Sequence, residues 1–93
     1  MQREDEVALY LKTLTVKDTN DLPTVLNEIN NRNTILIVRI TPIAERSIED
    51  LKLVVEEIFK HVKRSNGDIA RLGEDRLVVV PHNVRIWRDR SSL

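Results

Sequence analysis

The run Ile35–Ile40, ILIVRI, constrains the fold of this chain more than any other stretch. It is mostly β-branched and is apolar at both odd and even positions, apart from Arg39. Successive side chains of a strand point to opposite faces of the sheet, so this pattern predicts a strand covered on both faces. Two helical patterns accompany the run, and two helices can cover one face only. We therefore expect a second copy of the chain to cover the other face, in a homodimer.

The residues before this run predict one strand and one helix. Residues 6–13 alternate in polarity, which predicts a strand whose apolar face carries Val7, Leu9 and Leu11. Apolar residues at i, i+3, i+4 and i+7 then form one stripe of a helix, namely Leu22, Val25, Leu26 and Ile29. Pro23 is tolerated because it falls in the first turn of that helix. The order strand, helix, strand predicts a right-handed crossover between two parallel strands.

After Thr41 and Pro42, which we expect to stop the strand, the sequence predicts a long helix. Ser47 lies three residues before Asp50, which is close to a capping box. The apolar stripe continues for about four turns through Ile48, Leu51, Val54, Val55, Ile58, Phe59 and Val62. Gly67 is expected to close the helix in the left-handed conformation.

The remaining stretch predicts a hairpin with strands at Asp68–Leu72 and Leu77–Val80, and a last strand at Val84–Trp87. The predicted fold class is thus α/β, a small two-layer sandwich with two helices packed on one face of a mixed sheet. The sheet has about five strands in the order β-α-β-α-β-β-β. We expect a single domain over residues 1–93, with its core at about residues 7–87.

The composition disfavours several classes of function. Fifteen basic residues balance fifteen acidic ones, so the chain lacks the basic field of a general nucleic-acid binder. It has no cysteine, and its two histidines, His61 and His82, stand apart without the spacing of a metal site. Its only glycines, Gly67 and Gly73, cannot build a phosphate-binding loop. We therefore expect no enzyme activity, no metal and no cofactor. Two alternatives stay open: a small nucleic-acid-binding domain, and a regulatory domain that binds a metabolite.

The hairpin residues also carry a resemblance to a known family. Gly67-Asp68-Ile69, Leu72-Gly73 and the strand running into Pro81 and Asn83-Val84 follow a long helix and the run ILIVRI. In this arrangement the chain resembles SepF, a family of cell-division proteins, and it is most similar to the archaeal branch. The resemblance covers about residues 7–87. It implies a dimeric adaptor that binds the C-terminal tail of the tubulin-like GTPase FtsZ and helps to anchor it, in the cytoplasm, on the inner face of the membrane at the division site.

The resemblance also implies which residues bind this partner. A basic residue in the strand after the long helix falls on Arg71, and a bulky apolar residue opening the next strand falls on Leu77. Both residues must project from the same sheet face to bind one peptide. Bacterial members carry Phe where this chain has Leu77, so the contact offered here is smaller and not aromatic. The alternative is that Leu77 is a core residue and Arg71 a surface residue.

Two departures from the family concern assembly and the membrane. Bacterial members have a glycine in the long helix that is tied to larger rings, whereas the corresponding residues here are Phe59-Lys60-His61. We therefore expect a dimer without filaments. The family also carries an amphipathic membrane-targeting helix before the domain, but MQREDE has no apolar face to insert. Membrane attachment is expected through a segment absent from this chain or through another membrane partner.

Overall fold

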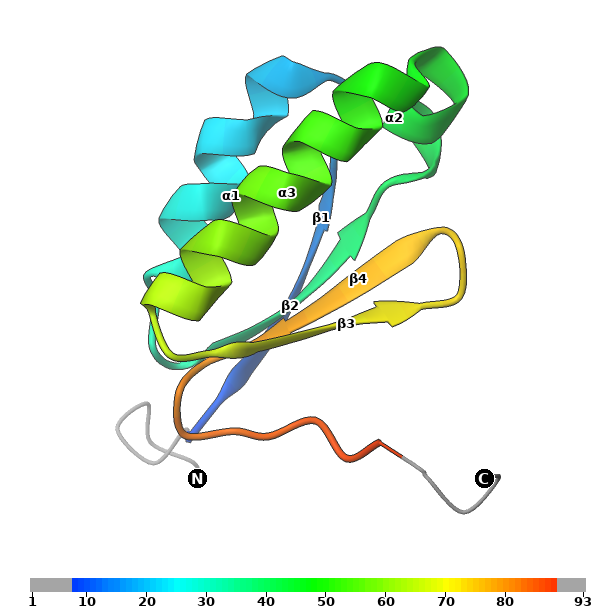
Figure 1. The fold of residues 1–93 in the computed structure, drawn as a ribbon. Helices are drawn as coiled ribbons and strands as arrows, with labels where there is room; N and C mark the ends of the chain where they lie inside the picture. Colours follow the sequence, from blue (N-terminus) through cyan, green and yellow to red (C-terminus); the bar gives the residue numbers. More distant parts are fainter. Residues whose placement is uncertain (1–7, 89–93) are drawn as a thin grey trace, which may run out of the picture.

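A computed structural model describes residues 8–88 of the chain. Within these residues one sheet is formed, in the spatial order β1-β2-β4-β3. Its strands are β1 (Tyr10–Thr15), β2 (Thr34–Arg39), β3 (Asp68–Leu72) and β4 (Arg76–Val80). Figure 1 shows that the helices lie on one side of this sheet, and they are α1 (Leu22–Ile29), α2 (Thr41–Arg46) and α3 (Ile48–Arg64). A 3-10 turn, η2 (Thr19–Asp21), precedes α1. The expected two-layer α/β sandwich is confirmed.

The pairing of β1 with β2 is parallel, as the crossover predicts, whereas β4 pairs antiparallel with both β2 and β3. The strand at the N-terminal side begins later than expected, at Tyr10, and the expected positions Glu6 and Val7 lie outside the described residues. Leu11 pairs with Ile35 and is 71% exposed on the sheet face without helices, called here the open face. Leu14 pairs with Val38 and packs against the core instead.

Both long helices begin and end where the sequence patterns indicate. Pro23 lies in the first turn of α1, where its missing N–H costs no hydrogen bond. The hydroxyl of Ser47 accepts a hydrogen bond of 3.1 Å from the backbone N–H of Asp50, which caps α3. The buried stripe of α3 consists of Leu51, Val54, Ile58 and Val62. These residues share one core with buried side chains from the helix-facing side of the sheet, among them Leu36, Val38, Ile69, Leu77 and Val79.

The short helix α2 was not expected from the sequence. Thr41 and Pro42 do end β2, but Pro42 then lies in the first turn of α2 rather than in a loop. Ile43 of this helix is fully buried, so α2 closes one end of the core. A six-residue helix shows too little periodicity to be distinguished from a loop by its apolar spacing.

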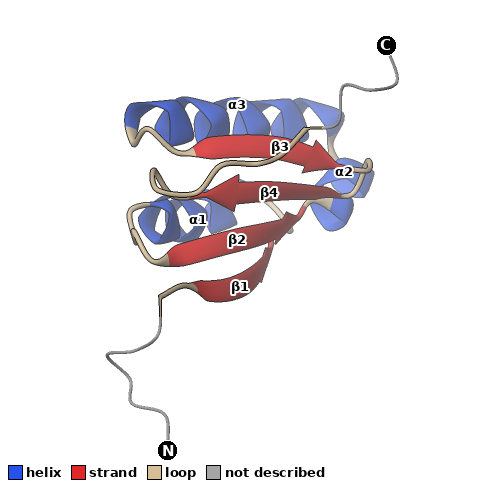
Figure 2. Cartoon of the chain, turned by 90° about the horizontal axis from the view of Figure 1, so that it is seen from below, coloured by secondary structure: helices blue, strands red, loops and turns tan. Residues whose placement is uncertain are grey.

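The expected last strand at Val84–Trp87 is wrong, and the sheet has four strands rather than about five. A turn in which the N–H of Val84 donates to Pro81 O at 3.0 Å takes the chain out of the sheet plane. Residues 81–88, called here the C-terminal segment, then cross the open face on the side opposite the helices (Figures 1 and 2).

Two residues near the end of α3 also differ from expectation. Phe59 was placed on the core stripe, but it is 47% exposed, with Lys63 Nζ 5.1 Å from the centre of its ring. It lies one residue beyond Ile58, on the solvent side of the stripe. The left-handed residue that follows α3 is Asn66, with φ 63°, and not Gly67. Gly67 is needed for another reason, since a Cβ there would lie 2.4 Å from the carbonyl oxygen of Val80.

Candidate functional site

A groove of about 260 Å³ lies between α3 and the strand β3. Its lining combines apolar and charged side chains, namely Ile48, Leu51, Lys52, Val55, Glu56 and Arg71. Leu51 is 9% exposed and Val55 is partly buried against the core, so these two form its floor. Lys52, Glu56 and Arg71 are exposed, so the charged groups lie along the rim. We refer to this feature as the α3–β3 groove.

The groove arises from the geometry of a helix lying beside a sheet edge. Ile48, Lys52 and Val55 are spaced at i, i+4 and i+7, so they share one side of α3 next to its buried stripe. β3 is an outer strand of the sheet, paired with β4 alone among the described strands. Within residues 8–88 no further strand therefore extends the sheet under that side of α3, and Ile48 stays 57% exposed.

The structure brings the two sequence-predicted site residues together. Arg71 of β3 pairs directly with Leu77 of β4, so both side chains project from the helix-facing side of the sheet. Leu77 is 3% exposed and belongs to the hydrophobic core. Arg71 is exposed, and its Nη2 donates a hydrogen bond of 3.0 Å to Glu74 O in the hairpin turn. Arg71 thus stands at the rim of the groove, directly beside a core residue.

Chemically, this arrangement suits the binding of a short peptide. An apolar floor beside an exposed edge strand can receive apolar side chains of an extended or helical segment. Arg71 makes no ion pair with any of residues 8–88, so its guanidinium is available to an acidic group of a ligand. Lys52 and Glu56 add one charge of each sign, which can fix the register of a bound peptide.

The sequence pattern placed Ile48 and Val55 on the core stripe and gave Lys52 and Glu56 no role in a site. The pattern does contain a signal for the groove. The apolar residues of α3 occupy a wider arc than the four buried residues need, and Ile48 lies at one border of that arc. A border residue that is half exposed indicates a surface beside the core rather than the core itself.

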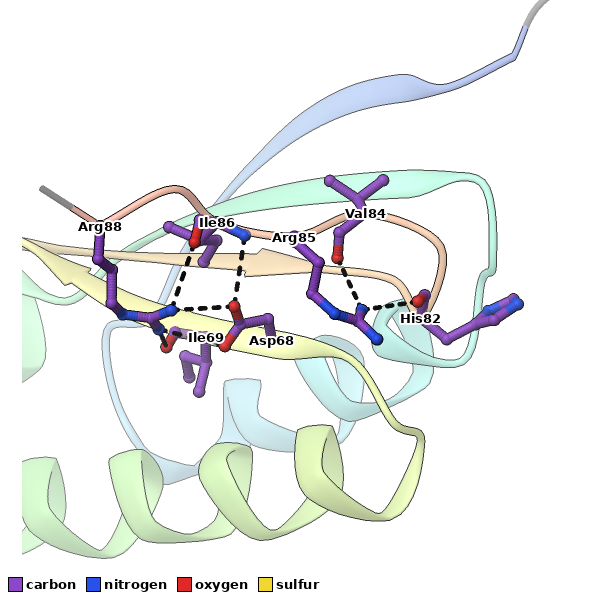
Figure 3. Close-up of polar contacts among 7 residues, drawn as sticks. All are labelled: Asp68, Ile69, His82, Val84, Arg85, Ile86 and Arg88. Atoms are coloured by element: carbon purple, nitrogen blue, oxygen red, sulfur yellow. Dashed lines mark hydrogen bonds and ion pairs between the residues drawn. The ribbon is translucent and has the colours of Figure 1, made fainter.

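A second polar site holds the C-terminal segment on the open face, as Figure 3 shows. The Asp68 carboxylate accepts two hydrogen bonds of 3.1 Å from the Arg88 guanidinium and one of 3.3 Å from the N–H of Ile86. Arg88 also donates to Ile69 O at 2.7 Å. The hydrogen bond from Arg88 is the main reason why the pKa of Asp68 falls from 3.8 to about 2; partial burial opposes it.

Within residues 8–88, no group of three or more His, Cys, Asp or Glu side chains is placed to hold a metal. His61 instead has its Nε2 3.0 Å from Asn30 Oδ1, which ties the end of α3 to the end of α1. No helix in this part of the chain is long and apolar enough to cross a membrane.

Three solved structures with the same fold are of archaeal proteins. A SepF-like protein from Archaeoglobus fulgidus is 25% identical with a TM-score of 0.77, covering 91% of this chain and 98% of that one. A SepF-like protein from Pyrococcus furiosus is 27% identical with a TM-score of 0.74, covering 85% and 94%. The cell division protein SepF from Methanobrevibacter smithii, solved in complex with FtsZ-CTD, is 15% identical with a TM-score of 0.67, covering 86% and 99%. The last likeness shows the fold alone.

Among curated proteins, none is significantly similar to this chain. A family model, described as Cell division protein SepF, matches residues 11–86. This match spans most of the chain, from within β1 to the C-terminal segment, and it includes both the α3–β3 groove and the hairpin. The chain therefore belongs to the SepF family of cell-division proteins.

Proposed function

We propose that this chain is a cell-division adaptor, without enzyme activity, that binds the C-terminal tail of FtsZ in the α3–β3 groove. The observation that carries the proposal is the groove itself, which joins an apolar floor to the exposed Arg71 beside an edge strand. The family supports the cellular role. The Methanobrevibacter smithii protein in complex with FtsZ-CTD supplies the partner by analogy.

Arg71 and Leu77 have different roles in this proposal. Arg71 pairs with an acidic group of the tail and fixes its register. Leu77 is 3% exposed and pairs with Arg71, so we assign it a supporting role, in which it holds the strand that carries Arg71 in place from the core.

The proposal includes a homodimer formed through the open face. That face carries apolar side chains from each strand, namely Leu11, Ile35, Ile37, Leu72 and Val78. Leu11 is 71% exposed and Leu72 is 49% exposed, and burying such surface against a second copy is favourable. Two copies joined there carry two tail grooves, which strengthens attachment to a polymer with many tails. The proposed role includes helping to attach FtsZ to the membrane at the division site.

Calorimetric titration of a synthetic FtsZ tail peptide tests the binding residues. Arg71→Ala should weaken binding about two- to fivefold, an effect that fades with added salt because the side chain is exposed. Arg76→Ala is the matched control, because Arg76 is an exposed arginine of the same hairpin on the opposite sheet face. Leu77→Ala should weaken binding by no more than Arg71→Ala if the variant is folded at the titration temperature, because Leu77 supports the strand that carries Arg71. Wild-type affinity in both folded variants would put the site elsewhere.

A further inference from the structure

A second hollow, of about 390 Å³, lies at the end of the molecule where α1 and α3 both finish. Its wall is built by the last residues of α1, the turn before β2, the turn after α3 and the residues that follow β4. Ile29 is 8% exposed and Pro81 is buried, so the floor is part of the folded core rather than a mobile loop. We call this feature the polar pocket. It does not overlap the α3–β3 groove.

The chemistry of the polar pocket is that of an anion site. Arg32 and Arg64 supply two guanidinium groups, and His82 adds an imidazole. Figure 3 shows the ring of His82 turned away from the Arg85 guanidinium, which donates instead to the carbonyl oxygen of His82 at 2.7 Å. Polar side chains complete the wall, from Asn30, Ser65 and Asn66, and of these the Ser65 hydroxyl already donates to Val62 O at 2.9 Å. None of the residues lining this pocket carries a carboxylate.

The two arginines are not needed to cap the helix. A helix C-terminus leaves carbonyl groups that basic side chains often satisfy. Here the carbonyl oxygens of His61, Val62 and Lys63 already accept hydrogen bonds from the backbone N–H groups of the turn Ser65–Gly67. Neither Arg32 nor Arg64 forms an ion pair with another residue of the described part of the chain. Two arginines and two side-chain amides lining one pocket suit the oxygens of a phosphate group.

We propose that the polar pocket binds the phosphate group of a phosphate ester, with Arg32 and Arg64 as its main ligands. The volume admits more than the phosphate alone, so the ester can be a soluble metabolite or a lipid headgroup. The pocket lies at the end of the domain where β1 begins, since the N–H of Tyr10 donates to Asn33 O, next to Arg32. Binding there is independent of the tail groove.

Titration of isotope-labelled protein with glycerol 3-phosphate, followed by amide chemical shifts, tests the soluble form. Ionic strength is held constant with sodium chloride. Saturable shifts should centre on the amides of residues 30–33, 64–67 and 82–83. The double variant Arg32→Gln/Arg64→Gln should bind at least about tenfold more weakly, equivalent to about 1.4 kcal/mol. Arg46→Gln is the matched control, since this exposed arginine ends α2 at the opposite end of the molecule (Figure 1).

Co-sedimentation with phosphatidylcholine vesicles containing phosphatidic acid tests the lipid form. Binding of the soluble ester alone would identify a metabolite site, and binding of the vesicles alone would identify a headgroup site. Either result supports the proposal provided that the double variant loses it and Arg46→Gln keeps it. The proposal is overturned if neither probe binds saturably, or if the double variant responds like the wild type. Tail-peptide binding, measured on the same samples, reports separately on the groove.

Discussion

The contacts of a single carboxylate, Asp68, decide where the C-terminal segment runs. Its bonds with Arg88 and Ile86 replace the backbone pairing that a further strand would have made. The sequence shows an Asp at the start of a strand and an Arg twenty residues later, and such a separation carries no periodic signal. The expected last strand at Val84–Trp87 was wrong because side-chain bonds, which patterns do not reveal, hold those residues instead.

The lowered pKa of Asp68 predicts how the stability of the fold depends on pH. A carboxyl group with a depressed folded-state pKa stabilises the fold above its ordinary value of 3.8, and this contribution is lost as pH falls toward about 2. Asp68→Asn should lower the free energy of unfolding by about 1 kcal/mol at pH 7, a value reduced by the exposure of Arg88 to water. Urea unfolding at pH 7, 5, 3 and 2 measures the difference. A gap between the two proteins that stays constant down to pH 2 would contradict the account.

A substitution at Gly67 tests how closely the end of β4 approaches the turn after α3. Gly67→Ala should lower the free energy of unfolding by about 1–3 kcal/mol, because its Cβ would lie 2.4 Å from the backbone oxygen of Val80. Asn66→Gly is the control, and it should change stability little because Asn66 is the residue with positive φ. Chemical unfolding measures both. If Gly67→Ala were neutral, β4 would not lie against this turn.

At the scale of elements, the sequence predicts those helices and strands that have a clear apolar period or a capping residue. The helix at Leu22–Ile29, the capped helix at Ile48–Arg64, the parallel pair and the hairpin all follow from local patterns. α2 does not, because one and a half turns hold too few apolar positions to show a period. The wrong placement of Phe59 has a related cause, since periodicity locates the centre of a buried stripe better than its borders.

Two leucines of the hairpin, one buried and one exposed, test which face of the hairpin belongs to the core. Leu77→Ala should lower the free energy of unfolding by about 2–5 kcal/mol, because a side chain 3% exposed leaves a cavity. Leu72→Ala, 49% exposed in the paired strand, should change the free energy of unfolding of the monomer by less than about 0.5 kcal/mol. Because Leu72 also belongs to the proposed dimer surface, the two variants are compared by thermal or urea unfolding at a protein concentration low enough to keep the chain monomeric. Similar losses for both leucines would mean that the hairpin faces are assigned incorrectly.

At the scale of the whole molecule, part of the site could be predicted and part could not. Arg71 and Leu77 come from the family resemblance, and their pairing on one sheet face is a matter of register that only the fold supplies. The α3–β3 groove and the polar pocket each join residues from elements far apart in the sequence. No spacing rule brings Arg32, Arg64 and His82 together, whereas the convergence of two helix ends does.

The open face predicts the state of assembly. Sedimentation equilibrium at micromolar concentration should give about twice the chain mass of 10.8 kDa, without larger polymers. Leu11→Glu should shift the equilibrium toward the monomer, because it places a charge on the apolar open face. Leu53→Glu, on an exposed part of α3, should leave the dimer intact. A mass of 10.8 kDa for the wild type at every concentration would contradict the dimer.

The central claim is that the α3–β3 groove holds the FtsZ tail, and amide chemical-shift mapping tests it most directly. Unlabelled tail peptide is titrated into isotope-labelled domain. The account predicts saturable shifts at residues 48–56 and 69–72, with the polar pocket unaffected. Ile48→Ala should weaken binding severalfold, because Ile48 lines the groove, and Leu53→Ala should not, because it lies outside it. Shifts centred on the open face or the polar pocket, with unchanged signals at the groove, would contradict the account.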